Sequence, residues 1–120
     1  MKSPTLYLSS NNSYAYSFYG QGNDAPFIPH IIPTLDIVVQ TAIRFSGSGS
    51  IDLFYNGILT ATMLNVTEFP APVTTMYIGC REEDDRAFSG EIYEHLVYDI
   101  PLSNDEIYHN FLVSKQRYFI

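Results

Sequence analysis

Alternating apolar and polar residues, interrupted by short turn-forming sequences, recur along most of the chain. In residues 51–55 (IDLFY) the first, third and fifth side chains are apolar, the period of a strand with one drier face. Asn56-Gly57 follows and favours a type I′ turn, because both central residues of that turn need positive φ angles. Ile58–Met63 supplies a return strand, so the sequence predicts a β-hairpin over residues 51–63.

Similar runs and one helix signal complete the predicted secondary structure. Further strands are predicted at residues 5–8, 14–19, 35–45, 75–80, 87–93, 94–100 and 115–120. Ser103 and Glu106 have the spacing of a capping box, which predicts one short helix at about 104–112. Many short strands with one late helix are typical of an all-β, antiparallel β-sandwich. The predicted core consists of Leu35, Ile37, Val39, Leu53, Ile78, Phe88, Ile92, Val97, Leu102, Ile107 and Phe111.

Four motifs follow one another in a characteristic order: FYNG at 54–57, YIG at 77–79, FSGEIY at 88–93 and YDIPLSNDEI at 98–107. This series resembles the closing half of laminin-G-like domains of the concanavalin A-like lectin/glucanase type and covers roughly residues 35–120. The resemblance implies a single jelly-roll β-sandwich domain over residues 1–120, of a kind used more often for binding and assembly than for catalysis. Only 34 residues precede Leu35, so the first half of the sandwich is shortened or is completed by another chain.

Composition narrows the classes of partner. Thirteen acidic residues against six basic ones give a net charge of −7, which disfavours binding to nucleic acid and to anionic membranes. The single cysteine, Cys80, excludes an intrachain disulfide. No apolar run approaches the roughly 20 residues of a membrane-spanning helix, and no signal-peptide pattern follows Met1. The sequence predicts a soluble domain that binds neither nucleic acid nor membrane.

Residues with catalytic or metal-binding chemistry do not form a recognisable site. Glu91 and Glu94 are three positions apart and would face opposite sides of a continuous strand, unlike the carboxylate pair of a glycosidase. The charged run 81–86 (REEDDR) fits a solvated loop, and its alternative role as a calcium site lacks the spacing of a dedicated calcium loop. We therefore expect a non-enzymatic protein with no catalytic residues, no metal and no cofactor.

The favoured function is a structural or assembly module that acts through protein–protein contacts. The stretch EIYHNF at 106–111, followed by KQRY at 115–118, resembles the endings of laminin-G-like domains in virion proteins of tailed phages and other large DNA viruses. That resemblance implies a capsid-decoration or tail-associated component of a virion, present as a homo-oligomer or within a larger assembly. The apolar residues expected to contact another copy or another structural protein are Phe27, Ile28, Ile31, Ile32, Tyr118, Phe119 and Ile120.

The alternative function is that of a carbohydrate-binding, lectin-like module on an extracellular surface. Tyr14, Tyr16 and Phe18 share one face of a predicted strand. Exposed aromatic rings in such a row stack on sugars, while neighbouring polar groups bind hydroxyls. Packing of the same rings in the core is the competing interpretation.

Overall fold

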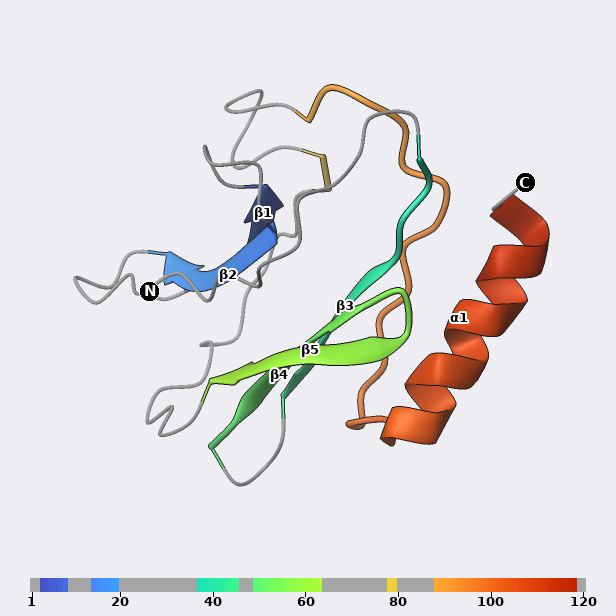
Figure 1. Cartoon of the computed structure of the whole chain (residues 1–120). Helices are drawn as coiled ribbons and strands as arrows, with labels where there is room; N and C mark the ends of the chain where they lie inside the picture. The colour runs from blue at the N-terminus through green and yellow to red at the C-terminus, as the bar shows by residue number, and fades with distance from the viewer. Residues whose placement is uncertain are drawn as a thin grey trace.

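The computed structural model describes residues 3–8, 14–19, 37–45, 49–63, 78–79 and 88–118. The strands and the helix in these ranges are β1 (Ser3–Leu8), β2 (Tyr14–Tyr19), β3 (Thr41–Phe45), β4 (Ile51–Tyr55), β5 (Ile58–Met63) and α1 (Asn104–Tyr118). Figure 1 shows a hairpin of β1 and β2, a second sheet of β3, β4 and β5, and α1 to one side of that sheet.

Both sheets are antiparallel. β1 pairs with β2 so that Ser3 lies opposite Tyr19. In the three-stranded sheet β4 is central, with Ile43 of β3 on one side of Leu53 and Ala61 of β5 on the other. The antiparallel strands and the C-terminal helix that the sequence predicts are thus present, while a complete two-sheet sandwich involves residues outside the described ranges and stays a prediction.

The predicted hairpin turn is confirmed. Tyr55 and Ile58 are paired across a two-residue loop, and the φ angles of Asn56 and Gly57 are 48° and 80°, as a type I′ turn requires. Asn56 also exchanges two hydrogen bonds of 2.8 Å with the backbone of Gln40, one through its own N–H and one through its side-chain Oδ1. The turn is therefore fixed to the chain that leads into β3.

The core of the described residues is centred on β4. Ile51, Leu53 and Phe54 are almost completely buried, and α1 adds Ile107 and Phe111. The sequence predicts one drier face for this strand, but the structure buries side chains on both faces, Asp52 and Phe54 as well as Ile51 and Leu53. Phe54, on the face predicted to be wetter, lies beneath the guanidinium group of Arg44, 4.9 Å from its ring centroid.

Helix α1 begins where the capping box predicts and ends later than predicted. It extends to Tyr118, so the expected strand at 115–120 is wrong for its described part. The last turns remain helical because their side chains make tertiary contacts. Ser114 is buried, and the ring of Tyr118 stacks on that of Tyr93 with 5.6 Å between the ring centroids. Lys115 and Arg117 also lie in the last turn, where positive charge stabilises the negative end of the helix dipole.

Residues 88–100, which precede α1, differ most from the sequence prediction. Residues 91–98 run without a turn or bend, yet they form no strand ladder. Five residues expected in the core are about half exposed or more: Ile37, Ile78, Phe88, Ile92 and Val97. Their burial would require a neighbouring strand or second sheet, and none of the described segments covers them. Val39 and Leu102 are half-buried, and Leu35 lies outside the described residues.

Candidate interaction surface

The segment 88–100 and helix α1 run antiparallel, and side-chain contacts of Tyr93, Glu94 and Tyr98 hold them together. Tyr93 stacks on Tyr118 near the helix C-terminus. The hydroxyl of Ser114 donates a 2.8 Å hydrogen bond to Oε2 of Glu94. Nearer the helix N-terminus, Asn110 Nδ2 donates to the Tyr98 hydroxyl at 3.1 Å. The helix thus supports the segment along its length.

The large apolar side chains of this segment that make none of those contacts are exposed. We call them the apolar strip: Phe88, Ile92, Leu96, Val97 and Ile100. Val97 retains 69% of its accessible surface and Ile100 retains 62%. Isolated exposed apolar residues are common on protein surfaces, but several gathered in one segment indicate a surface that contacts something else.

The backbone of the same segment is also unpaired. Within the described part of the chain, no backbone N–H or C=O group of residues 91–98 forms a hydrogen bond with another backbone group. Backbone groups are obligatory hydrogen-bonding partners, which are satisfied by protein or by water. An unbent, unpaired backbone next to exposed apolar side chains has the properties of an open sheet edge.

The charge of the segment is negative. Glu91 accepts a hydrogen bond from the Tyr93 hydroxyl, and this bond, with the charge of the carboxylate, raises the pKa of Tyr93. Glu94 lies 3.9 Å from the guanidinium group of Arg117. Asp99 adds an exposed carboxylate, while His95 is the single basic side chain between positions 88 and 100. A cationic partner is therefore favoured over an anionic one.

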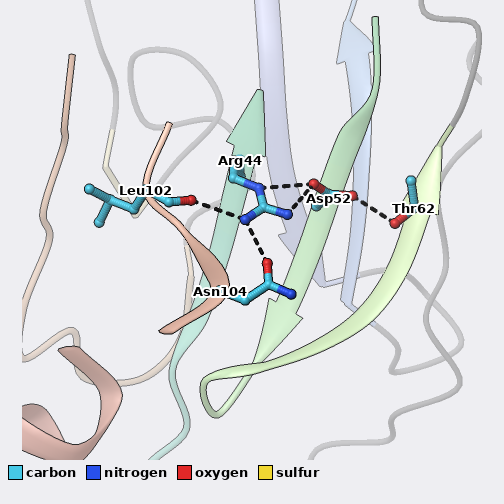
Figure 2. A network of polar contacts seen from close by, with 5 residues as sticks. All are labelled: Arg44, Asp52, Thr62, Leu102 and Asn104. Carbon is cyan, nitrogen blue, oxygen red and sulfur yellow. Dashed lines mark hydrogen bonds and ion pairs between the residues drawn. The ribbon is translucent and has the colours of Figure 1, made fainter. Parts of the chain in front are cut away.

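A network of polar contacts fixes the residues that follow this segment to the three-stranded sheet (Figure 2). Arg44 Nε and Nη2 both donate to Oδ2 of Asp52, at 2.9 and 2.7 Å. The Thr62 hydroxyl donates to the other oxygen of Asp52 at 2.7 Å. Arg44 Nη1 then donates to the backbone oxygen of Leu102 at 3.0 Å and to Oδ1 of Asn104 at 2.6 Å. The Arg44–Asp52 network therefore joins three strands to the start of α1.

The Arg44–Asp52 pair was missed by sequence reasoning, although the sequence carries a signal for it. Residues 46–50 (SGSGS) separate the strands predicted at 35–45 and 51–55, and a hairpin over these five residues places Phe45 opposite Ile51 and hence Arg44 opposite Asp52, the register that the structure has. Opposite charges in directly facing positions of two antiparallel strands stabilise their pairing. Burial of the pair depends on Leu102 and Asn104, which are distant in sequence.

A shallow cleft of about 330 Å³ lies between the end of the segment and the first turns of α1. Its walls combine an aromatic ring, an aliphatic side chain, carboxylates and polar side chains: Tyr98, Leu102, Asp105, Glu106, His109 and Asn110. Asn110 fixes the Tyr98 hydroxyl, and about half of the Tyr98 surface remains exposed. Such a wall can contact the apolar face of a ligand while its rim binds polar groups.

The capping box at the edge of this cleft leads to a test of pH dependence. Ser103 N–H donates to Oε1 of Glu106 at 3.0 Å, and Glu106 N–H donates to Oγ of Ser103 at 3.1 Å. The bond from the Ser103 backbone, followed by that from its side chain, lowers the pKa of Glu106. A lowered pKa means that this contribution to stability is present above the ordinary glutamate pKa and is lost as pH falls through the folded-state value.

We expect Ser103→Ala to destabilise the fold by about 1 kcal/mol, because the Glu106 N–H loses its acceptor, Oγ of Ser103, while the Ser103 N–H can still donate to Glu106. Glu106→Gln keeps a hydrogen-bonding side chain at this position and should flatten the acid-side loss of stability. Urea unfolding of the wild type and both variants, from neutral to acidic pH, measures these effects. An unchanged acid-side slope in Glu106→Gln would show that other carboxylates cause it.

Most of the residues predicted from sequence as sites have side chains outside the described part of the structure. Tyr14, Tyr16 and Phe18 occupy alternate positions of β2, but their side-chain surroundings are outside the described part. The predicted interface residues Phe27, Ile28, Ile31, Ile32, Phe119 and Ile120 lie outside the described residues, as does the charged loop 81–86. Tyr118 is described and packs on Tyr93 within the chain. The interface and sugar-binding assignments stay predictions.

The described residues contain no group of three or more metal-ligating side chains placed to hold an ion. Among the helical residues described here, none forms a segment long and apolar enough to cross a membrane.

Comparison with known proteins identifies relatives of the fold. The profile of the concanavalin A-like lectin/glucanases superfamily, of laminin-G type, matches residues 2–108. A crystal structure of part of an S-layer domain-containing protein from Clostridium thermocellum superposes with a TM-score of 0.57 at 19% sequence identity. That alignment covers 92% of this chain, which spans only 63% of the other. No curated protein sequence matches the chain.

Proposed function

Because this chain belongs to the concanavalin A-like lectin/glucanase superfamily, we propose that it is a non-enzymatic binding module that acts through protein–protein contacts in a larger assembly. The apolar strip is the observation that carries this proposal. Large apolar side chains grouped on an exposed segment mark contact surfaces in soluble proteins. The segment that carries the strip is also held against α1 by Tyr93 and Glu94, so a partner would meet a surface that is already in place.

The finer assignment is a capsid-decoration or tail-associated component of a virion, with this protein itself or other structural proteins as partners. It is supported by the resemblance of residues 106–111 and 115–118 to the endings of virion proteins. In the structure both stretches belong to α1, where Ile107 and Phe111 are buried. The exposed residues of α1, and not these two, are available to such a partner.

Fractionation on a density gradient, from the organism or virus that encodes the chain, tests the proposal. We expect the chain to co-migrate with large particles that contain capsid or tail proteins. Val97→Asp, within the apolar strip, should release it to the top of the gradient. Ile58→Asp serves as the control, because Ile58 retains 59% of its accessible surface and lies on β5, outside both the apolar strip and α1. A wild-type chain found only as free monomer would contradict the assembly function.

Carbohydrate binding is the second proposal, and the cleft at Tyr98 favours it. The half-exposed Tyr98 ring, Asp105 and His109 line one cleft and offer the combination of aromatic and polar groups that sugars bind. On a glycan array we expect saturable binding to one class of glycan and about a tenfold loss of affinity in Tyr98→Ala. Tyr98→Phe, which keeps the ring, should lose less. Tyr16→Ala tests the predicted face of β2 in the same assay, and an array without signal favours protein contacts.

A further inference from the structure

We propose that residues 91–98 bind a partner protein by accepting an added β-strand whose residues alternate between basic and apolar. This inference rests on the proposed assembly function and specifies how the contact is made. Recognition would come from the backbone of the segment, with the apolar strip and its carboxylates selecting the partner sequence.

The backbone supplies the first argument. Residues 91–98 have the length of an ordinary strand, contain no bend or turn, and have no backbone hydrogen bond to any described residue. The segment is not a loose linker, because contacts of Tyr93, Glu94 and Tyr98 hold it against α1. A backbone that is already held in place loses little entropy when a strand pairs with it.

The side chains supply the second argument. Ile92, Leu96 and Val97 are at least half exposed, so a neighbouring strand with β-branched residues would bury apolar surface on both chains. Burial of apolar surface is the main favourable term in most protein associations. Ile92 and Leu96 share one face of a continuous strand, so apolar residues at every second position of an added strand can contact both of them.

Charge decides between a second copy and a different protein. The segment and its immediate end carry Glu91, Glu94 and Asp99 against His95 alone, and the whole chain has a net charge of −7. Two copies paired through this segment would bring like charges together across the strands, which is destabilising. Lysine or arginine at every second position of an added strand lies on one face, where it can pair with Glu91, and the negative charge of the chain steers such a strand toward the segment.

The probe for this proposal is a capped peptide of alternating valine and lysine, titrated into the full-length chain while amide NMR signals are recorded. We expect saturable shifts concentrated in residues 91–98. A capped peptide of alternating valine and glutamate should bind at least tenfold more weakly. Equal binding of the two peptides would overturn the charge selection, and shifts confined to other residues would overturn the location.

Proline variants test whether the backbone itself is the recognition element. In a strand, the backbone N–H groups of two successive residues point to opposite edges. Proline has no N–H group, so one of the two variants Leu96→Pro and Val97→Pro removes a donor that faces the added strand. Neither substitution removes a backbone hydrogen bond within the described chain. We expect one of the two to weaken peptide binding at least tenfold, while Leu96→Val and Val97→Thr bind nearly as the wild type does.

Three outcomes would overturn the inference. Equal binding by both proline variants excludes strand addition. Loss of binding in Leu96→Val and Val97→Thr as well would indicate recognition of side chains alone. Sedimentation that shows a wild-type dimer, dissociated by either proline variant, would identify a second copy as the occupant. Because particle association is measured separately by gradient fractionation, strand addition can fail while the assembly function stands.

Discussion

Replacing Arg44 with methionine is expected to lower the free energy of unfolding by about 3–5 kcal/mol, one of the two largest effects in this protein. Asp52 is 6% exposed, and without Arg44 its carboxylate keeps only the Thr62 hydroxyl among the side-chain bonds of the network. The same substitution removes the hydrogen bonds to Leu102 and Asn104. Urea unfolding monitored by circular dichroism measures the loss.

The double variant Arg44→Met with Asp52→Leu is the matched control. Removing both charges avoids an unpaired buried carboxylate, and apolar replacement of a buried ion pair is often neutral for stability. We therefore expect the double variant to be more stable than Arg44→Met alone. A double variant as unstable as the single one would mean that the positioning bonds to Leu102 and Asn104, and not the charge pair, account for the loss.

The second large effect is expected for Gly57→Ala. The φ angle of Gly57 is +80°, a conformation that costs an alanine about 1–2 kcal/mol. A methyl group at this position would also lie 2.7 Å from Cβ of Phe111, where overpacking adds about 1–3 kcal/mol. Together these terms predict a loss of about 2–5 kcal/mol, measured by urea unfolding.

Gly79→Ala separates the two causes. The φ angle of Gly79 is +84°, but among the described residues its added methyl group would meet Cδ1 of Ile92 at an ordinary 3.6 Å. The loss in free energy of unfolding for this variant should therefore come from backbone strain alone. Equal losses in Gly57→Ala and Gly79→Ala would show that α1 does not lie tightly against the turn.

The features that sequence reasoning predicted well are those fixed by local chemistry. Asn56-Gly57 determines its own turn through the φ angles that its residues tolerate, and Ser103 with Glu106 determines where α1 begins. The end of α1 was misjudged because it depends on Gln40, which donates to Ser114 at 3.3 Å, and on Tyr93, which stacks on Tyr118. Neither partner is a neighbour in sequence.

Burial could not be predicted for the segment before α1. Ile92 and Val97 have the apolar character of core residues. The sequence pattern does not distinguish a strand that pairs within its own chain from one that pairs with another protein. These exposed residues were therefore assigned to the core. The Arg44–Asp52 network required a strand register and a contact with Leu102 that lie in different parts of the chain.

Amide hydrogen exchange of residues 91–98 most directly tests the claim that this chain presents an open, apolar segment to a partner. In the isolated full-length chain we predict fast exchange across 91–98 and slow exchange in β4, which is paired on both sides. In the native assembly, or with the valine–lysine peptide bound, alternate amides of 91–98 should become protected. Protection of residues 91–98 in the isolated monomer, equal to that of β4, would contradict the account.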